Sequence, residues 1–160
     1  MANPLTNEKE LFRRIQNEQI TVANGIWDLL YHKIGDDVSA INLLCQYYSA
    51  NNLELPSKDA EKIITYTMDV KQIIKDITAV SQDNFPFPDF KENAPLHPII
   101  RDLFTHYVNN DLNIINLAIY DCVDPDKGQQ PLTERHIQKI LEHTRCIQDF
   151  LEKLRKATLK

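Results

Sequence analysis

Two histidines stand at matched positions of the chain, each with an aspartate four residues before it. Asp28 precedes His32, and Asp102 precedes His106. On a helix this spacing places aspartate and histidine one turn apart. An exposed imidazole can act as a nucleophile, and a carboxylate one turn away can accept a hydrogen bond from the ring and fix its tautomer. The pattern therefore marks His32 and His106 as two candidate sites for histidine chemistry.

The two histidines belong to a longer internal repeat. Residues 27–44 and 101–118 lie 74 positions apart and are identical at seven of eighteen positions. Random pairing would give about one identity at ordinary residue frequencies. The same offset aligns apolar residues of a second segment, namely Ile63 with Ile137, Ile73 with Ile147, and Ile77 with Leu151. We interpret this as a duplication in which each copy keeps a histidine.

Apolar residues that recur every three, four or seven positions predict four helices. The first covers residues 7–49, with Asn7 and Glu10 as its capping pair and a break or bend near its glycines, around residue 24. The second begins at Ser57 and ends near residue 80, the third begins at Pro98 and carries His106, and the fourth covers residues 133–157. Residues 81–96, with three prolines, form the linker between the halves.

The predicted fold is an all-α, pseudo-twofold four-helix bundle made of two tandem helical hairpins. It forms a single domain over residues 1–160, with one repeat over about 7–80 and the other over about 97–158. Because both hairpins are in one chain, we expect a monomer. The predicted inward faces comprise Ile15, Val22, Ile26, Leu30, Ile34, Val38, Ile41, Cys45, Tyr48, Ile63, Val70, Ile73, Ile77, Val80, Ile100, Phe104, Val108, Leu112, Ile115, Ile119, Cys122, Ile137, Ile140, Leu141, Cys146 or Ile147, Phe150, Leu151 and Leu154.

Composition narrows the classes of function. The chain is 42% hydrophobic and 26% charged with a formal charge of −5, which is typical of a globular domain and unfavourable for binding nucleic acid or an anionic membrane. No long apolar run or signal peptide is present, so we expect a cytoplasmic protein. Cys45, Cys122 and Cys146 lack CxxC spacing and are expected to be buried, reduced thiols rather than metal ligands.

The histidines are expected to face solvent. Each lies two residues from an apolar residue on either side, and a step of two turns a helix by about 200°. The neighbours expected around His106 are Asp102, Asn109, Asn110 and Asn113; those around His32 are Asp28, Gly35, Asp36 and Ser39. Such short polar side chains leave room for another protein. The simplest alternative is a polar face on which histidine recurs only through the duplication, and His97, His136 and His143 are expected to be surface residues.

The residues from His106 onward, His-Tyr-Val-Asn-Asn-Asp-Leu-Asn-Ile-Ile, resemble the H-box of sensor histidine kinases, whose usual form is His-Glu-(hydrophobic)-(Arg or Asn)-Asn-Pro-Leu-x-x-Ile. Residues 132–155 are similar to the second helix of that family's dimerisation and histidine-phosphotransfer hairpin, and residues 32–41 look like a degraded H-box. The resemblance covers about two thirds of the chain. It implies that His106 is phosphorylated, that Asn110 influences dephosphorylation, and that Leu112 and Ile115 are core residues.

Departures from the H-box restrict this expectation. Tyr107 and Lys33 replace the acidic residue that follows the kinase histidine, and Asp111 and Asp37 replace the proline. With three glycines the chain also lacks the phosphate loops of an ATP-binding domain, so we expect no kinase activity from ATP. The remaining prediction is phosphoryl exchange with the aspartate of a response-regulator receiver domain. No cofactor is expected apart from the Mg²⁺ of that partner.

Two other classes of function stay open. A catalytically silent bundle would bind a receiver or a histidine kinase through the same exposed face, as an adaptor or inhibitor. A metal-binding bundle would use the pairs Asp28/His32 and Asp102/His106. Bundles of that kind turn their ligands into the core, whereas these pairs are expected to face outward, so no metal is predicted there.

Overall fold

The computed structural model describes residues 4–22, 30–78, 98–123 and 130–158, and every regular element in these ranges is helical. They are α1 (Pro4–Asn17), η1 (Leu30–Ile34), α3 (Gly35–Ala50), α4 (Ser57–Thr78), α5 (Pro98–Leu103), η2 (Phe104–Val108), α6 (Asn109–Val123) and α7 (Glu134–Thr158). The π-helical turn η1 runs directly into α3, and η2 joins α5 to α6, so the described chain contains five continuous helical segments. The predicted all-α class is confirmed.

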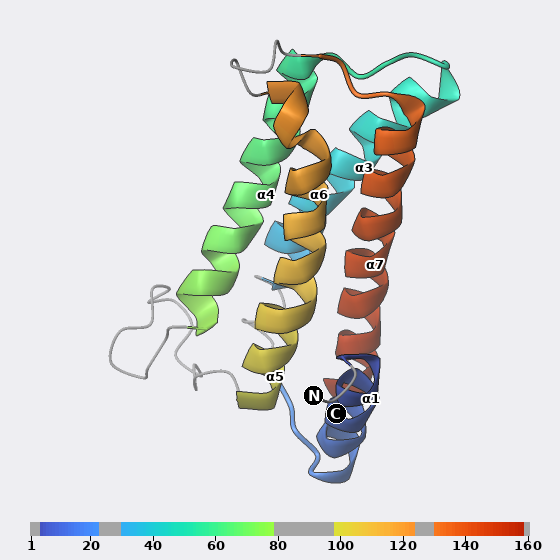
Figure 1. Cartoon of the computed structure of the whole chain (residues 1–160). Helices are drawn as coiled ribbons and strands as arrows, with labels where there is room; N and C mark the ends of the chain where they lie inside the picture. Colours follow the sequence, from blue (N-terminus) through green and yellow to red (C-terminus); the bar gives the residue numbers. More distant parts are fainter. Residues whose placement is uncertain (1–3, 23–29, 79–97, 124–129, 159–160) are drawn as a thin grey trace.

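Four long helices enclose the core (Figure 1). Helix α7 packs against α3 and α6, and α4 packs against the same two helices from the opposite side. Residues 51–56, which follow α3, and residues 130–133, which precede α7, lie together at one end, and α1 covers the other end of α7. There the ring of Phe12 meets the edge of Phe150 at 6.1 Å between centroids, and Lys153 lies over Phe12. Helix α1 therefore closes the open end of the core.

Most of the predicted inward positions are buried. Every predicted position on α5, η2 and α6 has less than about one tenth of its surface exposed, and so do the predicted positions of α3 other than Tyr48. Near the end of α4, Ile74 takes the inward position and the predicted Ile73 is only half-buried. On α7, Ile147 takes the inward position and Cys146 is exposed. Ile26 and Val80 lie outside the described residues, as does the side chain of Ile77.

The predicted first helix is wrong in its extent. Helix α1 begins at Pro4, so Asn7 lies inside it rather than at its cap, and it ends at Asn17. Gln19 adopts a left-handed conformation with φ 51°, which allows the amides of Gln19 and Ile20 to bond the carbonyls of Gln16 and Ile15. These two bonds are the Schellman arrangement that ends many helices, usually with glycine at the left-handed position. Glutamine gave no such signal in the sequence.

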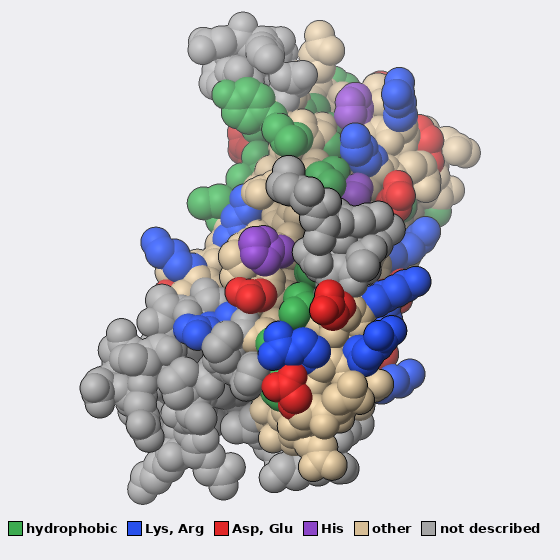
Figure 2. Space-filling view, turned by 60° about the horizontal axis from the view of Figure 1, so that its bottom comes forward, with side chains coloured by type: hydrophobic (Ala, Val, Ile, Leu, Met, Phe, Trp, Pro, Cys, Tyr) green, Lys and Arg blue, Asp and Glu red, His purple; other side chains and the backbone are tan. Residues whose placement is uncertain are grey.

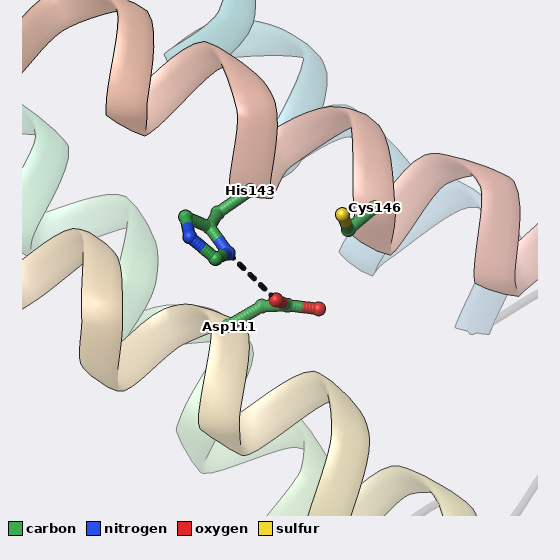
Figure 3. A group of neighbouring side chains, drawn as sticks. All are labelled: Asp111, His143 and Cys146. Carbon is green, nitrogen blue, oxygen red and sulfur yellow. Dashed lines mark hydrogen bonds and ion pairs between the residues drawn. The ribbon is translucent and has the colours of Figure 1, made fainter. Parts of the chain in front are cut away.

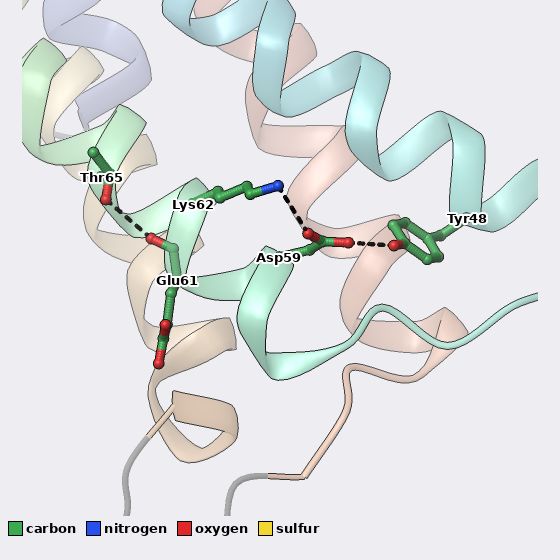
Figure 4. A network of polar contacts seen from close by, with 5 residues as sticks. All are labelled: Tyr48, Asp59, Glu61, Lys62 and Thr65. Carbon is green, nitrogen blue, oxygen red and sulfur yellow. Dashed lines mark hydrogen bonds and ion pairs between the residues drawn. The ribbon is translucent and has the colours of Figure 1, made fainter.

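The predicted end of the first helix, at residue 49, is confirmed by the end of α3 at Ala50. A polar contact stabilises the turn that follows α3. Asn52 has φ 54°, and the amide of Leu53 bonds the carbonyl of Tyr48. The Tyr48 hydroxyl donates to Asp59 at the start of α4, and Lys62 forms an ion pair with the same carboxylate at 3.3 Å (Figure 4). The hydrogen bond from Tyr48 lowers the pKa of the Asp59 carboxyl below its ordinary value. The contacts of the ionised Asp59 carboxylate therefore stabilise the fold at pH values above the ordinary pKa of aspartate. This contribution to stability is lost as the pH falls through the lowered pKa of Asp59.

Matched hydrogen bonds connect the first half of the chain to the second. Asn42 on α3 donates to Thr144 on α7 at 2.9 Å, and Asn116 on α6 accepts from Thr67 on α4 at 2.7 Å. The two asparagines are 74 residues apart, but the two threonines are 77 apart. Leu55 and Leu132, which exchange both backbone hydrogen bonds, are also 77 apart. The single offset of 74 therefore misaligns the second helices by three residues, nearly one turn, which keeps apolar positions roughly in phase.

The buried Asn42–Thr144 bond is expected to contribute more stability than its counterpart. Thr144→Val keeps the side-chain volume but leaves the buried Asn42 amide without its acceptor, which should lower the free energy of unfolding by about 1–3 kcal/mol. Thr67→Val should cost about 1 kcal/mol or less, because Asn116 is half-buried and water can replace the donor. Urea unfolding measures both, with exposed Thr65→Val as the matched control. Equal losses in all three variants would contradict this ranking.

Candidate functional site

Each predicted histidine occupies the centre of a five-residue π-helical turn. His32 is the third residue of Leu30–Ile34, and His106 is the third residue of Phe104–Val108. The residues at both ends of each turn are buried and the histidines are exposed, which confirms the predicted exposure. π-Helical turns are rare and occur frequently at functional sites. The two turns are 74 residues apart, at the same offset as the sequence repeat.

The buried ends of each turn hold it against the core. Phe104 begins η2 with 1% of its surface exposed, and its ring meets the edge of Phe150 on α7 at 5.5 Å between centroids. Val108 ends the turn and is fully buried. A π turn contains an extra residue relative to an α turn, so the residues between two such anchors bulge outward. The anchors therefore fix where the His106 ring meets solvent.

The His106 side chain lines a cavity of about 590 Å³ between α1 and the η2 segment. Asp102 and Asn110, both predicted neighbours, line this cavity, together with Tyr107. Helix α1 adds Glu10, Leu11 and Arg14, which the sequence did not place near the histidine. Asp102 and His106 are both described and form no hydrogen bond with each other, so the expected fixing of the ring tautomer is not seen.

Two predicted neighbours of His106 lie elsewhere. Asn109 and Asn113 line a different cavity with Lys71 and Lys75 of α4, and Asn113 accepts a hydrogen bond from Lys71 at 2.6 Å. The π turn explains this correction, because its i→i+5 bonds require more residues per turn than an α-helix. The residue four positions after His106, Asn110, then lies above it, while the residue three positions after it is rotated away.

His32 has a smaller and differently charged surrounding. Its cavity of about 280 Å³ is lined by the predicted neighbours Gly35, Asp36 and Ser39, and also by Gln148 and Glu152 of α7. Its ring meets the edge of Tyr31 at 6.1 Å between centroids. Asp28 lies outside the described residues. Among the described residues, no lysine or arginine lines this cavity, but the Arg155 guanidinium lies over the Tyr31 ring at 5.1 Å from its centroid; Arg14 lines the cavity of His106.

The surface seen from the α1 end carries charges of both signs. Figure 2 shows acidic and basic side chains interspersed over this face, with several Lys and Arg side chains along its right flank and histidine side chains at the surface. Arg14 is half exposed and forms an ion pair with Glu18 at 2.8 Å. The site therefore combines an imidazole, an amide and a guanidinium that is paired with Glu18, and the carboxylates of Glu10 and Asp102 line the same cavity.

Sequence reasoning missed a second cluster, which lies between α6 and α7. His143 was expected on the surface, but it is half-buried and its Nδ1 lies 2.8 Å from Asp111 Oδ1. Cys146, one turn after His143, lies beside them. The i, i+3 spacing of His143 and Cys146 was the available signal. His136 is exposed as predicted, and His97 lies outside the described residues.

The other two cysteines are buried, as predicted. Burial raises the pKa of the Cys45 thiol to about 12, so it stays protonated at neutral pH. Cys122 is also buried, and Cys146 alone among the three is exposed. Of Cys146 and Ile147, the two alternatives for the inward position on α7, Ile147 takes it, so the expectation of buried thiols does not extend to Cys146.

Comparison with known proteins leaves the fold and the site to be interpreted on their own. No protein-family model, curated protein or solved structure matches the chain. Within the described residues, none of the helices has the length and apolar character needed to cross a membrane.

Proposed function

We propose that this protein is a histidine phosphotransferase-like component of two-component signalling, which exchanges a phosphoryl group with a response-regulator receiver domain through His106. The observation that carries the proposal is the pair of matched π-helical turns, each with an exposed histidine at its centre. In this proposal two duplicated hairpins form one pseudo-twofold four-helix bundle within a monomer. The matched Asn–Thr bonds and the Leu55–Leu132 bridge support the duplication.

The chemistry requires only an exposed imidazole from this chain. A ring nitrogen of His106 attacks the phosphorus of the receiver's aspartyl phosphate, the N–P bond forms, and the receiver carboxylate leaves as the bond to its oxygen breaks. The proton of the ring is released to solvent or retained on the other nitrogen. The receiver and its Mg²⁺ supply most of the charge stabilisation. Asn110, in the same cavity, can donate a hydrogen bond to a phosphoryl oxygen.

The difference between the two cavities favours His106 over His32. A phosphoryl group adds negative charge, which a nearby guanidinium stabilises and a nearby carboxylate destabilises. Arg14 lines the His106 cavity together with Glu10 and Asp102. Asp36 and Glu152 line the His32 cavity, and the nearby Arg155 guanidinium is directed to the ring of Tyr31 rather than into that cavity's lining. We therefore assign the principal phosphoacceptor role to His106 and a minor one to His32.

The runner-up function is an adaptor or inhibitor that binds a receiver or histidine kinase without chemistry. Leu43 and Leu117 occupy matched positions 74 residues apart, and 66% and 75% of their surfaces are exposed. Leucines that are this exposed in both halves suit a protein contact, although single exposed apolar residues are common on surfaces. Docking through these two leucines is compatible with either function, so only the fate of the phosphoryl group separates the two functions.

The experiment that tests the proposal compares two phosphoryl donors. Incubation with a receiver domain phosphorylated on its aspartate should label the protein in an acid-labile, base-stable form, which is characteristic of phosphohistidine. Incubation with labelled ATP and Mg²⁺ should leave it unlabelled, because the chain carries no recognisable nucleotide-binding motif. Receiver binding without any label would favour the adaptor, and labelling from ATP alone would contradict both functions.

A further inference from the structure

We propose that Asp111, His143 and Cys146 form a binding site for a divalent metal ion of the zinc class. Asp111 comes from α6, and His143 and Cys146 come from successive turns of α7 (Figure 3). One ligand atom from each residue lies within 4.8 Å of the other two. His143 and Asp111 point toward one another across the space between the two helices, and Cys146 lies beside them on α7. No function of the histidine turns is needed for this inference.

The set of donor atoms favours zinc among the common ions. A thiolate, an imidazole and a carboxylate are all ligands that Zn²⁺ accepts, whereas Mg²⁺ and Ca²⁺ prefer oxygen alone. Zinc–ligand bonds of about 2.0–2.3 Å in a tetrahedron place the ligand atoms about 3.3–3.6 Å apart. The 2.8 Å contact between His143 Nδ1 and Asp111 Oδ1 would open slightly, and Cys146 Sγ would move closer. Side-chain rotations suffice for such shifts.

The surroundings of the three ligands suit a bound ion. The side chains of Asp111 and His143 each have 17% of their surface exposed, so they are held in place and only partly solvated. An open cavity of about 520 Å³ adjoins two of the three ligands, Asp111 and Cys146, and Asp149, Lys153 and Lys156 are among its other lining residues. This opening gives an ion access from solvent. It also leaves room for a water molecule, or for the Asp149 carboxylate, as the fourth ligand.

The corresponding residues of the first half make a control within the molecule. Asp37 corresponds to Asp111 at the offset of 74, and Tyr66 and Asp69 correspond to His143 and Cys146 at the offset of 77. This set offers neither an imidazole nor a thiol. We therefore expect one zinc-class ion per chain, at the α6–α7 site alone.

Binding should be tied to the protonation of the ligands and to the stability of the bundle. The ion takes the place of the proton on the Cys146 thiol and requires an unprotonated nitrogen on His143, so affinity should fall as pH decreases. An ion held by both α6 and α7 binds the folded chain better than the unfolded one. Saturating metal should therefore raise the temperature of unfolding.

The test uses Co²⁺ as a spectroscopic substitute for Zn²⁺, added to the reduced, metal-free full chain. One equivalent of Co²⁺ should produce the visible bands of a tetrahedral site and a near-ultraviolet thiolate-to-metal band, and Zn²⁺ should displace it. Cys146→Ser should abolish the thiolate band, and His143→Ala and Asp111→Asn should each weaken binding by about tenfold or more, as loss of a direct ligand exceeds loss of an outer partner. His136→Ala, an exposed histidine on the same helix, should bind as the wild type does.

Thiol alkylation provides a second measurement that does not depend on spectra. Iodoacetamide should modify Cys146 in the metal-free protein, and Zn²⁺ should slow this reaction, while the buried Cys45 stays unmodified in both states. Failure of Co²⁺ to give a saturable thiolate band in the folded wild-type chain would overturn the proposal. Unchanged binding by Cys146→Ser would overturn it as well, because the ion would then lie elsewhere.

Discussion

His106→Ala is expected to remove most of the phosphoryl label that a phosphorylated receiver transfers to this protein, whereas His32→Ala is expected to remove little. The nucleophile is lost in the first variant. In the second, the cavity that contains Arg14, Asn110 and the acceptor ring stays intact. Quantification of acid-labile, base-stable label on each variant under identical conditions measures the difference.

The two histidine variants also control for folding. Both side chains are exposed, so each substitution should change the free energy of unfolding by no more than about 0.5 kcal/mol and leave the helical circular dichroism unchanged. Loss of label therefore reports on chemistry rather than on structure. Equal loss of label in both variants would contradict the assigned asymmetry between the two cavities.

Phe104→Ala is expected to give the largest loss of stability among the single substitutions considered. Among the described residues, Phe104 is the largest of the fully buried side chains; it packs edge-to-face against Phe150 and anchors the π-helical turn that carries His106. Truncation of a buried phenylalanine removes apolar contacts and leaves a cavity, which typically costs about 3–5 kcal/mol. The midpoint of urea unfolding, with the slope held constant, measures the change.

Leu117→Ala is the matched control for this loss. Leu117 lies on α6, in the same continuous helical segment as Phe104, but 75% of its surface is exposed. Its truncation should change stability by about 0.5 kcal/mol or less. A Phe104→Ala variant no less stable than Leu117→Ala would contradict the packing around η2. It would also remove the reason given for the position of the His106 ring.

The sequence predicted the helices best where apolar periodicity is uninterrupted. The segment from Pro98 to Cys122 has every predicted inward residue buried, because one stripe continues through the whole segment. The prediction that the first helix continues beyond Asn17 was wrong, because the left-handed conformation that ends α1 falls on Gln19 rather than on glycine or asparagine. Tertiary packing of Ile15 and Ile20 outweighs the local preference there.

The candidate site was predicted in its central residue but not in its surroundings. The exposure of His106 follows from its position two residues from both Phe104 and Val108, because a step of two residues turns a helix by about 200°. The π turn, by contrast, shifts the following residues around the helix, so Asn110 stays near the ring and Asn109 does not. No local residue preference marks such a turn in one sequence. Arg14 reaches the cavity only because α1 folds back across the bundle, a contact that sequence spacing does not predict.

The Asp111–His143–Cys146 cluster shows a different limit. The sequence places His143 and Cys146 on one face of a helix, but the face toward α6 depends on how the two helices pack. A three-residue difference between the repeats separates the correct alignment of α4 with α7 from the ungapped one. Because the shift is nearly one turn, apolar residues still align with apolar residues at either offset. The residues that correspond to His143 and Cys146 differ between the two offsets.

The most direct test of the central claim is the location of the phosphoryl group on the wild-type chain. After reaction with a phosphorylated receiver, peptide mapping under alkaline conditions that preserve phosphohistidine should find the phosphate on His106. A minor fraction on His32 is consistent with the same account. Phosphate confined to other residues would contradict it, and so would unlabelled protein that binds the receiver equally well with and without the His106 side chain.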